Sequence, residues 1–122
     1  MATTFRDLHH GDEPLLLPNA WDVGSALAFV AAGFPAVGTT SFGVNASTGR
    51  PDAAGASREA TVALIRRLRV LPVHVTADIE DGFSDDPDAV GELVAGLGAA
   101  GVTLEDSAGG RLVDPGIPAA KI

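Results

Sequence analysis

Short apolar runs alternate along the chain with longer stretches in which apolar residues recur every three or four positions. The runs are typical of buried strands, and the three-to-four spacing predicts helices with one buried face. We expect strands at 15–18, 35–40, 72–77 and 101–104, helices at 21–32, 57–69 and 86–100, and a further helix beginning near 119.

Several residues at the predicted helix ends support these boundaries. Asp22 and Ser57 stand at N-cap positions, and Gly33 stands where a left-handed residue ends a helix. Asp86 caps the third helix, and Pro87 occupies its first turn, where a missing N–H costs nothing. The segments 41–56 and 107–118 are rich in polar residues, glycine and proline, and are predicted as loops. A loop as long as the first one is usually functional or disordered.

The alternation of strands and helices predicts an α/β fold with a parallel sheet, formed by residues 1–122 as a single unit. Two architectures fit this order. One is a small doubly wound sheet. The other is half of an eight-stranded (β/α) barrel, which normally needs about 250 residues. The length favours the first, and the position of the acidic residues favours the second.

The composition narrows the classes of function. The chain has 122 residues, with 8 Lys and Arg against 16 Asp and Glu, giving a net charge of -8. An acidic chain without a basic patch is a poor match for nucleic acid or an anionic membrane surface. Cysteine is absent, which excludes disulfides and thiolate chemistry and suits a cytoplasmic location. The sequence carries neither a signal-peptide pattern nor an apolar run long enough for a membrane span.

Acidic residues follow the third and fourth predicted strands. Asp78 and Glu80 come after one and Glu105 after the other, while Asp52 lies in the long loop. Ligands of parallel α/β folds bind at the carboxyl ends of the strands. We expect Asp78 and Glu80 to share one face as their strand finishes. Converging carboxylates with no sulfur ligand nearby are typical of Mg²⁺ sites.

A simpler interpretation exists for each acid, because capping and solvated loop residues are also often acidic. This interpretation is the one we favour for four of them: Asp81, Asp85, Asp86 and Asp88. His74 lies inside the third strand and is interpreted as a hydrogen-bonded core residue.

Five segments, taken in order, resemble the isocitrate lyase/phosphoenolpyruvate mutase superfamily from about residue 5 to 122. They are LPNAWD at 17–22, GFPAVGTTS at 33–41, TGRPD at 48–52, TADIEDGF at 76–83 and AGVTLED at 100–106. Each motif alone is weak, but the ordered set is fairly specific. The resemblance implies the N-terminal half of a TIM-type (β/α)8 barrel, because it ends after the fourth strand.

The resemblance also implies a function and a set of site residues. Members of this family use Mg²⁺ and act on small 2-oxo acids, phosphonates or carboxylates through an enolate-like species, as carbon–carbon lyases or phosphonomutases. Asp78 would contact the metal directly, with Glu80 and Glu105 doing so directly or through water. Asp52 would lie near the metal and the reacting group, so Asp52 and Glu105 are the candidate catalytic residues. Substrate would be bound by Thr40, Ser41 and Phe42.

The sequence departs from the family pattern after the Glu105-Asp106 pair. The lyase branch has a Lys-x-Cys-Gly-His loop there, whereas this chain has SAGGRL at 107–112. The usual isocitrate or methylisocitrate cleavage is therefore not expected, and the phosphonomutase-like branch is the better match. An open half-barrel exposes a parallel edge strand and an apolar inner face, so we expect a homo-oligomer, such as a two-fold pair that completes a barrel.

Two alternatives remain open at this point. The chain could be a non-catalytic fragment of such a barrel. It could also be a receiver-like signalling domain, a five-stranded fold with an acidic Mg²⁺ pocket. Of the residues that a receiver needs, Asp78 alone matches.

Overall fold

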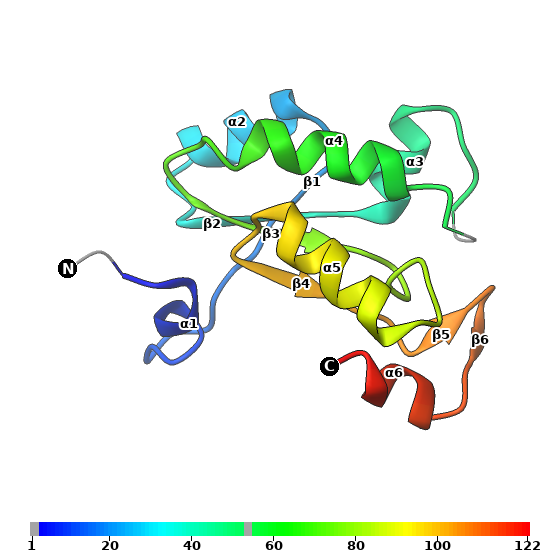
Figure 1. Ribbon diagram of the computed structural model, residues 1–122. Helices are drawn as coiled ribbons and strands as arrows, with labels where there is room; N and C mark the ends of the chain where they lie inside the picture. Colours follow the sequence, from blue (N-terminus) through cyan, green and yellow to red (C-terminus); the bar gives the residue numbers. More distant parts are fainter. Residues whose placement is uncertain (1–2, 53–54) are drawn as a thin grey trace.

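The computed structural model describes residues 3–52 and 55–122. Its main sheet has four parallel strands in the order β1-β2-β3-β4: β1 (Asn19–Ala20), β2 (Ala36–Thr39), β3 (His74–Asp78) and β4 (Gly101–Thr103). Each strand therefore pairs with the next one along the chain (Figure 1). A doubly wound sheet reverses its strand order at a switch point, whereas a barrel does not. The sheet has the sequential order of a barrel.

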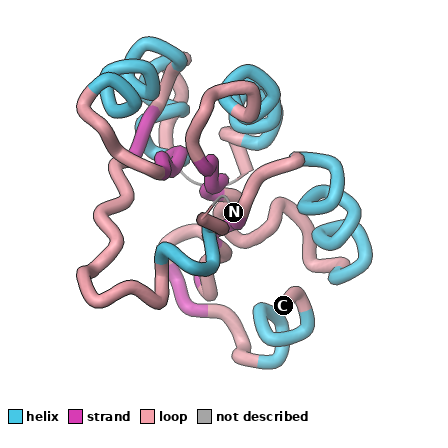
Figure 2. The backbone as a smooth tube through the Cα atoms, turned by 90° about the vertical axis from the view of Figure 1, so that its left-hand side faces the viewer, coloured by secondary structure: helices cyan, strands magenta, loops and turns pink. Residues whose placement is uncertain are grey.

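Three helices connect successive strands: α2 (Val23–Ala31), α4 (Arg58–Leu68) and α5 (Pro87–Leu97). Figure 2 shows the strands near the middle, with these helices arranged around their outer side. The remaining elements are α1 (Phe5–Leu8), α3 (Ser41–Ser47), a small antiparallel pair of β5 (Ser107–Ala108) and β6 (Arg111–Leu112), and α6 (Gly116–Ala120). The parallel β/α units predicted from the sequence are confirmed.

Five predictions from the sequence about where elements lie are wrong. The first strand is Asn19–Ala20 instead of 15–18. Pro18 has no N–H to donate, and its carbonyl accepts the Gly38 N–H at 2.8 Å just before the strand begins. The segment 41–56, of which residues 53 and 54 lie outside the description, contains α3. The segment 107–118 contains the β5–β6 hairpin, and α6 begins at Gly116 instead of 119. At the end of the third connecting helix, α5 stops at Leu97 because Gly98 takes a left-handed conformation (φ 67°).

The helix caps follow the sequence prediction with one exception. The Asp22 carboxylate accepts the Ser25 N–H at 2.7 Å, and the Asp86 carboxylate accepts the Asp88 N–H at 3.0 Å. Gly33 has a φ of 90° after the end of α2. Ser57 does occupy the N-cap of α4, but its side chain makes no capping hydrogen bond. Its hydroxyl is directed to the candidate site instead.

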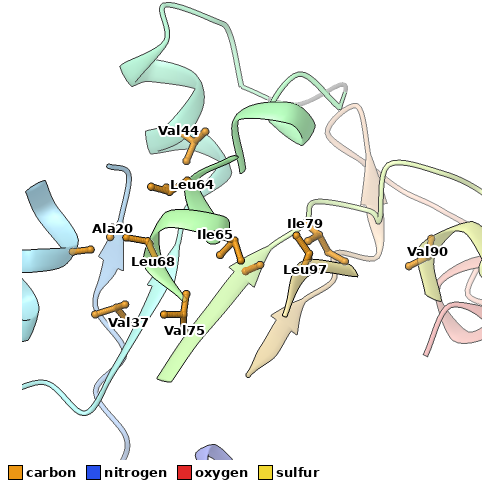
Figure 3. Packing of buried hydrophobic residues seen from close by; sticks show 12 residues of the cluster. Ala20, Val37, Val44, Leu64, Ile65, Leu68, Val75, Ile79, Val90 and Leu97 are labelled. Atoms are coloured by element: carbon orange, nitrogen blue, oxygen red, sulfur yellow. The ribbon is translucent and has the colours of Figure 1, made fainter. Parts of the chain in front are cut away.

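The hydrophobic core lies between the sheet and its helices (Figure 3). Helix α4 contributes Leu64, Ile65 and Leu68, which pack over Val37 of β2 and Val75 of β3. All five side chains are buried, and burying one of this size contributes about 1.5–3 kcal/mol. The core therefore fixes the strands from one side and leaves their carboxyl ends free to carry a site.

The opposite face of the sheet is less apolar than expected. Asn19, Gly38, Thr76 and Gly101 lie side by side in the strand register, so this layer is small and polar. Phe5 of α1 lies against it, because a Cβ built on Gly101 would stand 2.9 Å from the Phe5 ring. The exposed parallel edge is present as expected: β4 is the last strand of the sheet, and its central residue is 36% exposed.

Candidate active site

Asp78 is the last residue of β3 and links it to the end of β2. One carboxylate oxygen, Oδ2, accepts the Ser41 N–H at 2.8 Å, and the other, Oδ1, accepts the Glu80 N–H at 3.0 Å. The Asp78 N–H in turn donates to Thr39 Oγ1 at 3.0 Å. Both oxygens are therefore oriented by backbone donors, and each keeps a lone pair for another partner. A carboxylate that is oriented in this way is suited to bind a metal ion.

Glu80 lies beyond the end of β3, in a left-handed conformation with a φ of 53°. Strand alternation therefore no longer applies at Glu80, and the expectation that it shares a face with Asp78 loses its basis in the strand geometry. Its carboxylate accepts the Ser57 hydroxyl at 2.5 Å and the Gly55 N–H at 3.4 Å. The residue is only 5% exposed, and within the described ranges it forms no ion pair. A buried carboxylate held by neutral donors alone leaves its charge available to a cation.

Glu105 follows β4 and completes the group. Its N–H donates to the Glu80 carbonyl oxygen at 2.7 Å, and its side chain accepts the Ser107 hydroxyl at 3.3 Å. Burial and the neighbouring charge of Asp78 raise the pKa of the Glu105 carboxyl, as do the charges of Glu80 and Asp52, while the Ser107 hydrogen bond opposes the shift. Asp78, Glu80 and Asp52 are therefore close enough for their negative charges to act on Glu105.

A cavity of about 210 Å³ lies among these acids. It is lined by Asp52, Gly55, Glu80, Asp81 and Glu105, and by residues 107–110 of the β5–β6 hairpin. Three of the acids expected at the site therefore line one cavity. Asp78 lies next to these acids, because its carboxylate accepts the Glu80 N–H, but it does not line the cavity.

The three expected substrate-binding residues lie at the start of α3. Thr40 caps this helix by accepting the Gly43 N–H at 3.3 Å. Ser41 is buried with its N–H engaged by Asp78, and Phe42 is 65% exposed. The structure therefore connects this segment to Asp78, while the cavity itself is lined by other residues.

The donor chemistry of the site suits a cation that takes one or two carboxylates from the protein and keeps water ligands, as Mg²⁺ does. Across residues 3–52 and 55–122, no three His, Cys, Asp or Glu side chains are arranged to hold one metal ion together. Mg²⁺ usually keeps several waters and takes one or two carboxylates from the protein. Oriented carboxylate oxygens that repel one another provide such a donor set.

Sequence reasoning missed three contributors to the site. Ser57 was predicted only as a cap, and Asp81 only as a loop residue. The hairpin was predicted as a loop, although Gly109-Gly110 between two short segments is a recognised hairpin signal. Both glycines have positive φ angles, of 57° and 76°, as the turn requires. No sequence pattern indicates that the Ser57 hydroxyl reaches Glu80, because that contact spans 23 residues.

The fold and the site together define a β/α-barrel unit with an acidic cluster at the carboxyl ends of its strands. The family model for phosphoenolpyruvate phosphomutase matches residues 5–122. The chain therefore belongs to the phosphoenolpyruvate mutase family, as the sequence resemblance predicted. This membership, with the sequential strand order, rules out the receiver-like alternative.

Individual relatives agree with this assignment. The uncharacterized protein Rv1998c of Mycobacterium tuberculosis is 55% identical over 119 residues, which cover 98% of this chain and 46% of that protein. A candidate phosphonomutase from Burkholderia cenocepacia J2315 superposes with a TM-score of 0.86 at 37% identity, over 96% of this chain and 50% of that one. Oxaloacetate acetylhydrolase with bound oxalate gives a TM-score of 0.82 at 25% identity, over 93% of this chain and 43% of that enzyme.

The chain spans about half the length of the relatives that it matches. Its four parallel strands are likewise half of the eight strands of a (β/α) barrel. Of the helices in the described parts of the chain, none has the length and apolar character needed to cross a membrane.

Proposed function

We propose that this chain carries the metal-binding half of an Mg²⁺-dependent active site. Its substrate is a small anionic 2-oxo acid, phosphonate or carboxylate, which reacts through an enolate-like species. The observation that carries the proposal is the convergence of Asp52, Glu80 and Glu105 on one cavity, with Asp78 hydrogen-bonded beside Glu80. A related enzyme of the same fold has been crystallised with oxalate, a small dicarboxylate.

The acids have different roles in this proposal. Asp78 and Glu80 hold the cation, because their carboxylates are fixed by backbone and hydroxyl donors. When bound, Mg²⁺ supplies positive charge next to the substrate oxygen on which negative charge develops. Glu105 and Asp52 are the candidate catalytic residues, and the raised pKa of Glu105 suits a group that exchanges protons with the substrate.

Substrate binding is assigned to the start of α3, on the sequence resemblance. The Ser41 N–H already donates to Asp78, so the contacts left for a substrate carboxylate or phosphonate are the Ser41 hydroxyl and the backbone of Thr40 and Phe42. Exposure of Phe42 leaves this segment accessible.

The reaction type is proposed to be that of the phosphonomutase-like branch. The chain has no cysteine, and the β5–β6 hairpin takes the place of the lyase branch's cysteine loop beside the cavity. The candidate phosphonomutase is also among the more similar solved structures, at 37% identity. A carbon–carbon lyase that does not use cysteine is the second candidate, supported by the likeness to oxaloacetate acetylhydrolase.

A homo-oligomer is part of the proposal. Both edge strands, β1 and β4, are parallel, so a two-fold pair could join β4 of each copy to β1 of the other and close eight strands. Light scattering at tens of micromolar tests this expectation, and a monomer at that concentration would contradict it.

Thermal unfolding with Mg²⁺ and oxalate, added singly and together, tests the active-site proposal. Ligands bound by the folded state alone stabilise it, by about 2.7 kcal/mol at a hundred times the dissociation constant. We expect a rise in melting temperature that needs both ligands. The rise should be lost in Glu105→Gln, because the resemblance also places Glu105 at the metal, directly or through water. The matched control is Glu92→Gln, the same change on the exposed face of α5, which should keep the full rise.

Two outcomes count against the proposal. A full rise in Glu105→Gln would remove that residue from the site. No rise in the parent chain would favour the non-catalytic fragment, and the same titration on a chain of full barrel length would then show whether the missing half is required.

A further inference from the structure

Lys121 is a buried cation that the proposed mechanism does not use. It is the only lysine in the chain, and it follows directly after α6. Its side chain is 3% exposed. Removing an ammonium group from water is unfavourable unless hydrogen bonds replace the lost solvation. The partners of this group therefore indicate what it does.

The principal partner of Lys121 is the backbone of the turn that follows β3. The ammonium donates to the Asp81 carbonyl oxygen at 2.8 Å, 40 residues away in sequence. The second partner is Asp85 Oδ1 at 3.7 Å, on a side chain that is 90% exposed. The contact is weak at that distance, because water reaches the exposed Asp85 carboxylate and screens its charge. The short bond to the Asp81 carbonyl is therefore the stronger contact.

The turn that Lys121 holds has an unusual backbone. Three of its residues, Glu80, Gly82 and Phe83, have φ angles of 53°, 94° and 61°. The left-handed region is unfavourable for non-glycine residues, and such a conformation persists when its surroundings impose it. Contacts from outside the turn are therefore needed to keep Glu80 in place.

Two such contacts hold neighbouring carbonyl groups. The Glu105 N–H donates to the Glu80 carbonyl at 2.7 Å, and the Lys121 ammonium holds the next carbonyl, that of Asp81. Two further hydrogen bonds lie within the turn itself, from the Gly82 N–H to the Ile79 carbonyl and from the Phe83 N–H to the Asp81 carboxylate. The turn is thus pinned from the end of β4 on one side and from α6 on the other.

We propose that Lys121 is a positioning residue, whose ammonium fixes the Asp81 carbonyl and so keeps the Glu80 carboxylate directed at the site cavity. The structural part of this inference stands on the contacts above. Its consequence for metal binding rests on the proposed function.

Amide hydrogen exchange of the full chain, followed by NMR, tests the structural part without any metal. Lys121→Met should speed exchange of the Gly82 and Phe83 amides about tenfold, while the amides of Val75 and Ala77 inside β3 stay unchanged. Lys121→Arg, which keeps a cationic donor, should restore most of the protection. Unchanged exchange at both turn amides in Lys121→Met would overturn the proposal.

A further variant separates the effect of the ammonium from that of the general packing of α6. Ile117→Ala loosens this helix but leaves Lys121 in place, so it should have little effect on the turn amides; an effect equal to that of Lys121→Met would overturn the proposal. If Lys121→Met does not fold, Lys121→Gln and Asp85→Asn decide. Lys121→Gln should speed exchange in the turn and Asp85→Asn should not, and the reverse pattern would refute the assignment.

Calorimetric titration with Mg²⁺ in the presence of oxalate tests the consequence, at a temperature where every variant is folded. Lys121→Met should weaken Mg²⁺ binding about tenfold, the size expected when a group that orients a ligand is removed. Equal affinity in Lys121→Met and the parent would overturn the link to the site. A parent chain that does not bind Mg²⁺ would instead contradict the proposed function, while the exchange experiment would still judge Lys121.

Discussion

Two buried threonines provide a test of how hydrogen bonding at the site contributes to stability. Thr39 and Thr61 are 4% and 1% exposed. Thr39 Oγ1 accepts the N–H of Asp78 at 3.0 Å. Among the residues that the structure describes, Thr61 Oγ1 has no hydrogen-bond partner. The same substitution, threonine to valine, therefore removes a satisfied acceptor in one case and an unsatisfied hydroxyl in the other.

The two variants should change the free energy of unfolding in opposite directions. Thr39→Val leaves the part-buried Asp78 N–H without its acceptor, which costs about 1–3 kcal/mol. Thr61→Val removes a buried hydroxyl that has lost its hydration, which should gain about 1 kcal/mol. The helix propensities of threonine and valine are nearly equal, so α4 itself should not be affected.

Urea unfolding at neutral pH measures both changes against the parent. The slope of the free energy with urea should stay constant, so that the shift in midpoint reports stability alone. A change of 1 kcal/mol should move the melting temperature by about 4 °C in a domain of this size. The reasoning is refuted if Thr61→Val destabilises the protein as much as Thr39→Val does, because the Thr61 hydroxyl would then have a partner.

Three further predictions concern the site and its supporting turn. Gly82→Ala should cost about 1–3 kcal/mol, because φ is 94° and the new Cβ would lie 2.8 Å from Val90; Gly91→Ala, which has open space, is the matched control in thermal unfolding. Ser57→Ala should cost about 1–3 kcal/mol in urea unfolding, since it removes a donor from the buried Glu80 carboxylate, and a neutral result would show that the bond does not hold Glu80. The pKa of Glu105 is raised in the folded state, so the stability that it contributes is full below its ordinary value of 4.5 and is lost as the pH rises from there through the raised pKa. Melting curves from pH 4 to 7 should therefore show a smaller loss in Glu105→Gln than in the parent, and parallel curves would contradict the shift.

The sequence predicts most of the fold because its elements are local. The periodicity of 57–69 places α4, and Asp22 and Asp86 cap helices within three residues of themselves. Helix α3 was missed because 41–47 contains glycine, serine and asparagine, which are weak helix formers. It forms where the Thr40 side chain caps it and Asp78 accepts the Ser41 N–H, and that second bond spans 37 residues.

The same distinction explains which parts of the candidate site were predictable. Parallel strands bring their carboxyl ends together, so the positions of Asp78 and Glu105 along the sequence are enough to predict that they lie near one another. The direction of the Glu80 side chain depends instead on a left-handed backbone and on donors from Ser57 and Gly55, which belong to another part of the chain. Strand alternation is a valid guide only while the chain remains a strand, and β3 ends at Asp78. The residues that carry charge to the site can therefore be found in the sequence, whereas those that orient the charge, including Ser57, emerge only from the folded arrangement.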